Sequence, residues 1–308
     1  MAIDRVRRAL YGISGVHITP YAGDGSVDAA MLKRVVDRIV AAGVHNVVSA
    51  GNTAEFFALT PEEVAKVHDA AVAAAAGRSI VTAAVGRSLI EAVDMAKRAG
   101  RIGADAVMVH HPLDPFAAPS AQAEYFAAVA DASPVPVVAY VRSDAIGPAA
   151  LARLARHANI AGVKFATTNL MQFAECVRAA EGAAAVWVCG LAEGWAAPFY
   201  ALGGRGFTSG LVNVMPELSL AIHAALEAGD YARARALVNE VVAFETMRAK
   251  HNNGANVTVV KEAMKLIGFD VGTVRRPGLV ALDDADRVAL RTIVAGWQAR
   301  HGNAAAAQ

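Results

Sequence analysis

The chain has 308 residues, of which 55% are hydrophobic and 19% are charged, a composition that excludes intrinsic disorder. Its 29 basic and 28 acidic residues give a net charge of +1, so no surplus charge favours nucleic acid or an anionic membrane as a partner. No apolar run reaches the roughly 18 residues of a membrane span, so we expect no membrane partner of that kind either.

Short apolar runs rich in β-branched residues recur at intervals of about 21 to 34 residues, the length of one βα unit. They lack a clean alternation of apolar and polar residues, which indicates burial on both faces, as in a parallel sheet. The expected strands are Ile13–Thr19, Asn46–Ala50, Ile80–Val85, Ala106–His110, Val135–Val141, Ile160–Phe165, Ala185–Cys189 and Gly206–Ser209.

Amphipathic helical patterns separate these strands. The segment Val27–Ala42 places apolar side chains on one face and charged side chains on the other. Thr60, followed by a proline and two glutamates, has the form of a helix N-cap, so a helix is expected to begin there. After Pro216 the strand signals stop, and helices are expected at Glu217–Ala228, Tyr231–Lys250, Val257–Leu266 and Asp283–Arg300.

Eight βα units predict a (β/α)₈ TIM barrel with a C-terminal helical extension. We expect residues 1–229 to form the barrel and residues 230–308 to form a helical region packed on it. A doubly wound open sheet is the alternative fold, but no Gly-x-Gly-x-x-Gly motif follows the first strand.

The chain has two cysteines, Cys176 and Cys189, which are too few for a disulfide framework. No apolar leader follows the charged start MAIDRVRRAL. We therefore expect buried thiols in a cytoplasmic protein.

A lysine and a tyrosine on neighbouring strands carry the strongest chemical signal, because active sites of such barrels lie at the carboxyl ends of the strands. Lys164 interrupts the apolar strand Ile160–Phe165, and inner strands of a barrel have no solvated edge for a lysine to reach. A desolvated amine loses its proton more readily and attacks carbonyl carbons. Tyr140 ends the preceding strand, where its phenol can relay protons as an imine forms and breaks.

The segment Gly51–Glu55 follows the second strand. Its glycine allows the backbone to approach a ligand, and the amide of Asn52, the hydroxyl of Thr53 and free N–H groups suit a carboxylate. The alternative is a turn that leads into the Thr60 helix.

Two further motifs indicate other ligands. His110 and His111 are adjacent on a strand and point to opposite faces, so we expect no metal site. The turn Gly203–Gly206, which contains Arg205, is either a phosphate cradle or a tight turn between a helix and a strand.

Together these positions resemble the superfamily of dihydrodipicolinate synthase and N-acetylneuraminate lyase. The superfamily's loop after strand two reads roughly Gly-Thr-Thr-Gly-Glu, which compares with Gly51–Glu55. Its relay tyrosine ends strand five, as Tyr140 does, and its imine lysine follows a Gly-Val or Gly-Ile pair, as Lys164 does. The resemblance covers nearly the whole chain and implies a Schiff-base lyase on a (β/α)₈ barrel that uses no cofactor and is usually a tetramer.

Departures from the synthase concern the substrate. An arginine five residues after the relay tyrosine is replaced by Ala145, and the tyrosine of the loop after strand four corresponds to Phe116. The segment from Tyr140 to Asp144 instead resembles the Tyr-Asn-Arg-Asp segment of 5-dehydro-4-deoxyglucarate dehydratases. Arg142 then lies where a second substrate carboxylate would dock, because its fork binds two oxygens at once.

The lyase branch of the superfamily holds sugar hydroxyls with residues that match Gly190, Glu193 and Ser209. We therefore expect a homo-oligomeric lyase, tetrameric or dimeric, that acts on pyruvate or a sugar-acid-derived 2-keto acid, and we favour dehydration over aldol chemistry. Authentic 4-hydroxy-tetrahydrodipicolinate synthase, a phosphosugar isomerase that uses the Arg205 turn, and a non-catalytic keto-acid sensor are the alternatives.

Overall fold

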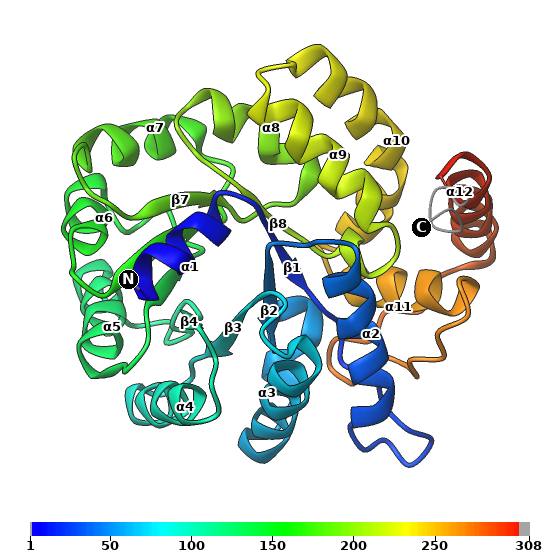
Figure 1. Ribbon diagram of the computed structural model, residues 1–308, viewed down its shortest axis with the longest axis horizontal. Coiled ribbons are helices and arrows are strands. Elements are labelled where there is room, and N and C mark those ends of the chain that lie inside the picture. Colours follow the sequence, from blue (N-terminus) through cyan, green and yellow to red (C-terminus); the bar gives the residue numbers. More distant parts are fainter. Residues whose placement is uncertain (1, 302–308) are drawn as a thin grey trace.

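The computed structural model describes residues 2–301 and shows a closed barrel of eight parallel strands surrounded by helices (Figure 1). The strands follow one another in chain order, and β8 pairs with β1 to close the sheet. The predicted (β/α)₈ barrel is therefore confirmed. The strands are β1 (Ile13–Val16), β2 (Asn46–Ser49), β3 (Ile80–Val85), β4 (Ala106–Val109), β5 (Val137–Val141), β6 (Ile160–Phe165), β7 (Val186–Cys189) and β8 (Phe207–Ser209).

Helices connect the strands and cover the outside of the barrel (Figure 1). The Thr60 hydroxyl accepts a hydrogen bond from the Glu63 N–H, and the Glu63 carboxylate accepts one from the Thr60 N–H, so the predicted cap is a complete capping box. The barrel helices are α2 (Ala29–Ala41), α3 (Pro61–Ala75), α4 (Leu89–Arg101), α5 (Pro119–Ala132), α6 (Pro148–Ala155), α7 (Leu170–Ala179), α8 (Glu193–Ala201) and α9 (Pro216–Glu227). Short 3₁₀ turns follow β2 and β8: η1 (Asn52–Ala54), η2 (Phe56–Ala58) and η3 (Leu211–Asn213).

Strand β1 is shorter than predicted. At its carboxyl end, the side chain of Asn213 bonds the backbone groups that a neighbouring strand would otherwise bond. The amide of Asn213 accepts from the Ile18 N–H at 3.1 Å and donates to the Val16 carbonyl at 2.9 Å. These bonds satisfy the buried backbone beyond Val16 without a strand partner.

Alternating strand side chains build two buried layers. The outward layer packs against the helices, and the inward layer fills the barrel. Helix α1 (Ala2–Leu10) was not predicted, because charged residues dominate its sequence. It crosses the opening of the strand ring and adds Val6 and Leu10 to the inward layer (Figure 1). Strand side chains in that layer include Val16, Val48, Ala84, Met108, Val138, Tyr140, Val186 and Val188.

Three further helices gather on one side of the barrel (Figure 1). They are α10 (Tyr231–Ala249), which packs on α8 and α9, α11 (Asn256–Leu266) and α12 (Asp284–His301), and they confirm the C-terminal extension. The division at residue 229 stays a prediction, and residues 302–308 of the predicted C-terminal region lie outside the described part. Within residues 2–301, no helix combines the length and apolarity needed to cross a bilayer.

Candidate active site

Lys164 projects into the barrel from β6, directly beside Tyr140 on β5. The strand register pairs the two residues, and the Lys164 Nζ lies 3.8 Å from the centroid of the Tyr140 ring. The Met108 sulfur is 4.0 Å from the same nitrogen, and Lys164 is only 5% exposed. The amine lines a small cavity inside the barrel, which Val138, Val188 and Thr208 also line.

The surroundings of Lys164 favour its uncharged form. Burial and, to a smaller extent, the positive charge of Arg142 together lower the pKa of Lys164 to about 7. Among residues 2–301, no carboxylate forms an ion pair with this amine. A large fraction of the amine is consequently neutral and nucleophilic near neutral pH.

The hydroxyl of Tyr140 is held from across the barrel mouth. The Asn52 Nδ2, at the end of β2, donates a hydrogen bond to the Tyr140 hydroxyl oxygen at 3.2 Å. Burial raises the pKa of Tyr140, so the phenol keeps its proton at neutral pH. Because the oxygen accepts from Asn52, its own O–H remains available to donate to a ligand.

Asn52 and Thr53 form the start of η1. Only glycine fits before them, because a Cβ at Gly51 would lie 2.6 Å from a methyl carbon of Val16. The Thr19 hydroxyl donates to the Ala54 carbonyl at 2.7 Å and fixes the turn against β1. The first N–H groups of a helical turn have no partner within it, so this segment offers donors suited to a carboxylate.

Arg142 follows Tyr140 and is exposed at the rim of the barrel. Its guanidinium carbon lies 5.9 Å from the Tyr140 ring centroid, and its backbone N–H donates to the His111 Nδ1 at 3.4 Å. Arg142 thus reaches over the same phenol that Lys164 contacts from inside. The structure brings Lys164, Tyr140, Asn52 and Arg142 together at one mouth.

The two adjacent histidines diverge. His110 stacks on Phe56, with ring centroids 4.2 Å apart, and lies 5.7 Å from the Tyr140 ring, whereas His111 lies beside Phe126. Burial, together with the charge of Lys164, lowers the pKa of His110 to about 3, so its ring is neutral. The contact between His110 and Tyr140 was not predicted from the sequence, although side chains alternate along a strand and the side chain at one of the two histidine positions must point into the barrel. No cluster of three or more potential metal ligands occurs among residues 2–301.

Glu193 and Ser209 contact each other at the ends of β7 and β8. The hydroxyls of Ser209 and Ser219 both donate to the Glu193 Oε1, at 2.5 Å and 2.6 Å. Burial, with the nearby charge of Glu245, raises the pKa of Glu193. The hydrogen bonds found for these side chains join α8, β8 and α9, and none among the described residues reaches Lys164 or Tyr140.

Gly190 closes the end of β7. Its N–H donates to the Phe165 carbonyl at 2.7 Å, and a Cβ there would lie 2.6 Å from that of Ala166. Glycine is therefore required for packing against the end of β6, whatever its part in ligand binding.

Two further positions from the sequence analysis lie away from the mouth. Arg205 lies in the turn between α8 and β8, at the amino end of the barrel, which is the tight-turn alternative and is on the side opposite the Lys164 mouth. The turn serves packing instead, because a Cβ at Gly206 would lie 2.2 Å from the Leu10 carbonyl oxygen of α1. Phe116, in the loop between β4 and α5, is 93% exposed and does not reach Tyr140 in this chain.

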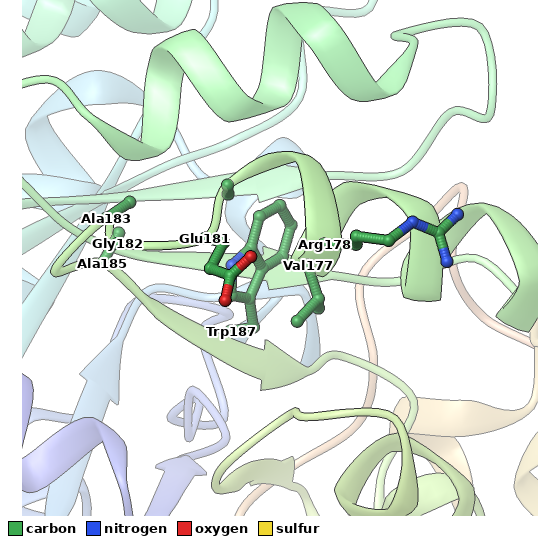
Figure 2. A pocket seen from close by; sticks show the side chains of 8 residues that line it. Val177, Arg178, Glu181, Gly182, Ala183, Ala185 and Trp187 are labelled. Atoms are coloured by element: carbon green, nitrogen blue, oxygen red, sulfur yellow. The ribbon is translucent and has the colours of Figure 1, made fainter.

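A separate surface hollow lies where α7 leads into β7 (Figure 2). Because a helix-to-strand connection lies at the amino end of a parallel barrel, this hollow is also remote from Lys164. Its lining includes Val177, Arg178, Glu181, Gly182, Ala183 and Trp187.

The fold and this mouth define a (β/α)₈ barrel that holds a buried amine beside a phenol. The sequence profile described as the dihydrodipicolinate synthetase family matches residues 9–296. The chain belongs to that family and is a lyase.

Relatives of known name agree with this assignment. The chain is 35% identical over 287 residues to 4-hydroxy-tetrahydrodipicolinate synthase of Gluconacetobacter diazotrophicus, covering 91% of this chain and 94% of that one. It is 34% identical over 268 residues to a Streptomyces coelicolor protein named "Probable 5-dehydro-4-deoxyglucarate dehydratase 1", covering 84% of each. The crystal structure of dihydrodipicolinate synthase from Bacillus clausii superposes with a TM-score of 0.92 at 36% identity, covering 95% of this chain and 99% of that one.

Proposed function

We propose that this protein forms a Schiff base between Lys164 and a 2-keto acid derived from a sugar acid, and that it eliminates water from that substrate. The observation that carries the proposal is the buried Lys164 amine, 3.8 Å from the Tyr140 ring centroid and without a carboxylate partner in the described chain. The dehydratase named among the relatives supports the choice of reaction.

The first chemical step joins enzyme and substrate. Carbons are numbered from the carboxylate next to the keto group, so the keto carbon is C2. The substrate's 1-carboxylate docks on Asn52 and Thr53, and the neutral Lys164 amine attacks the keto carbon. The former carbonyl oxygen takes one proton from the amine nitrogen and one from the Tyr140 phenol, and it leaves as water. An iminium on Lys164 and a phenolate on Tyr140 remain.

The second step uses the iminium as an electron sink. The Tyr140 phenolate takes a proton from C3, and the released electron pair forms an enamine. The enamine then expels the C4 hydroxyl, which takes the proton back from Tyr140 and leaves as water. Hydrolysis of the imine returns Lys164 and releases the product. Arg142 holds the far carboxylate with its two-pronged guanidinium.

Aldol condensation of pyruvate is a second candidate, favoured by the 35% identity to a named 4-hydroxy-tetrahydrodipicolinate synthase. Position 145 weakens it, because the resemblance to that synthase places there an arginine for the second substrate, and this chain has an exposed alanine.

A comparison of substrates tests the proposal. The purified protein is assayed for water elimination from 5-dehydro-4-deoxyglucarate and for condensation of pyruvate with aspartate semialdehyde. We expect turnover of the sugar-derived acid and at most slow condensation, and both activities vanish in Lys164→Met. Preferred condensation would overturn the dehydratase assignment, and full turnover by Lys164→Met would overturn the imine.

We also propose that the protein is cytoplasmic and that it forms a tetramer or dimer. Cys176 and Cys189 are free and buried, which suits a reducing compartment. Ile90 at the start of α4 and Leu113 and Phe116 in the loop before α5 are exposed at the carboxyl rim, and a second copy of the chain would cover such apolar groups. Sedimentation of the purified protein tests this assembly, and a monomer at micromolar concentration would contradict it.

A further inference from the structure

The turn that carries Asn52 and Thr53 ends at Glu55, a residue in an unusual backbone conformation. Glu55 has φ 64° and ψ 35°, the left-handed region that glycine adopts freely and that other residues adopt at a cost. A glutamate at such a position indicates that its side chain is needed there.

The Glu55 carboxylate contacts two residues of the C-terminal part of the chain, Lys261 and Arg275. Its Oε1 forms an ion pair with the Lys261 Nζ at 2.7 Å, with side-chain exposures of 4% for Glu55 and 1% for Lys261. Its Oε2 accepts the Arg275 N–H at 2.8 Å. Helix α11 and the loop after it therefore bind the end of the η1 turn, which carries Asn52 and Thr53.

Lys261 is held on its other sides as well. Its ammonium donates to the Thr273 carbonyl at 2.9 Å and lies 4.1 Å from the centroid of the Tyr21 ring. The Arg275 guanidinium lies 4.3 Å from the same ring and also forms an ion pair with Glu63 on α3. We call Glu55, Lys261, Arg275 and Tyr21 the loop clamp.

Stability alone does not explain the loop clamp. Removing two charges from water costs as much as a buried ion pair returns, and an apolar pair of similar volume often serves stability equally well. What the ion pair adds is a fixed direction and distance between α11 and the residue that ends η1.

We propose that Lys261, acting through Glu55, is a positioning residue that sets the carboxylate-binding turn at Asn52 and Thr53 relative to Tyr140 and Lys164. The inference rests on the proposed function, in which that turn binds the substrate's 1-carboxylate. Lys261 touches neither substrate nor reacting atoms. It fixes the far end of the turn, while the Asn52–Tyr140 hydrogen bond fixes the near end.

The test measures keto-acid binding by the full chain, with pyruvate as the probe. Borohydride reduction at increasing pyruvate concentration, followed by mass spectrometry, gives the half-saturating concentration and the maximal extent of trapping at Lys164. We expect Lys261→Met to raise the half-saturating concentration about 10- to 100-fold, because small displacements of a binding group are costly, while maximal trapping is retained. Lys265→Met on the same helix, at a partly exposed site, is the matched control and keeps the wild-type value.

A double variant separates positioning from stability. Glu55→Gln/Lys261→Met removes both charges of the ion pair and keeps an oxygen that can accept the Arg275 N–H, so we expect thermal stability near that of the wild type but a raised half-saturating concentration. It also carries the test if Lys261→Met does not fold. Wild-type pyruvate binding by a folded variant of either kind would overturn the inference. Absence of trapping in the wild-type protein would instead overturn the proposed function.

Discussion

Lys164 and Lys261 are both buried lysines on regular elements, yet their surroundings assign them opposite tasks. The Lys261 ammonium forms an ion pair with the Glu55 carboxylate and donates a hydrogen bond to the Thr273 carbonyl. Lys164 meets a thioether and the face of a phenol ring. Burial lowers the pKa of Lys164 to about 7 and that of Lys261 to about 8, where Glu55 acts against the effect of burial.

The difference teaches that burial alone does not make a lysine a nucleophile. An amine attacks only when its lone pair is free and directed at space that a carbonyl carbon can enter. Lys164 has no carboxylate partner among residues 2–301 and faces the Tyr140 ring, whereas Lys261 lies between the Glu55 carboxylate and the Thr273 carbonyl. The following experiments separate the two lysines.

Exchange of each lysine for methionine gives the largest contrast. Lys164→Met removes the attacking nitrogen, so we expect turnover to fall by more than about 10³-fold. Lys261→Met leaves that nitrogen in place and is expected to retain kcat within about tenfold, with the loss appearing mainly in KM. Steady-state kinetics on folded variants measure both parameters, and equal losses of kcat would break the comparison.

Substitution of Tyr140, whose phenol faces Lys164, is expected to have the second-largest effect. Tyr140→Phe keeps the ring against the amine but removes the proton relay, so we expect kcat to fall about 10²- to 10⁴-fold. Rapid-quench measurement of imine formation and turnover locates the loss. An unchanged kcat would show that another group, such as a bound water, moves the protons.

Arg142 distinguishes the substrate's two ends. Arg142→Gln should raise KM for a dicarboxylic keto acid about 10- to 100-fold, because a charge-assisted hydrogen bond to the far carboxylate is lost. Pyruvate, which has no second carboxylate, serves as the control and should bind as before. A similar weakening for both acids would place Arg142 at the 1-carboxylate instead.

The pH dependence gives the smallest effect. The neutral amine is the reactive form, so kcat/KM should rise as pH increases through about 7, the pKa of Lys164. Because the charge of Arg142 lowers that pKa, Arg142→Gln should move this limb to higher pH. Stopped-flow trapping across pH 5 to 9 (about two units on either side of 7) measures the limb. If the rise of kcat/KM stays at the same pH in Arg142→Gln, the charge of Arg142 does not act on the pKa of Lys164.

Local patterns predicted most of the fold and the centre of the site. β-branched runs located all eight strands, and a lysine inside an apolar strand pointed to Lys164. The ion pair between Glu55 and Lys261 was not predicted, because residues so distant in the chain leave no local signal. The sequence left the Arg205 turn open between a packing turn and an anion cradle, because glycines and an arginine occur in both, and only the topology places it at the amino end of the barrel.

Reductive trapping of wild-type protein with pyruvate and borohydride, followed by peptide mass mapping, tests the central claim most directly. We predict one modified site, Lys164, with the added mass of a reduced pyruvate imine. Modification of Lys261 in its place, or no modification at saturating pyruvate, would contradict the assignment of Lys164 as the imine-forming residue.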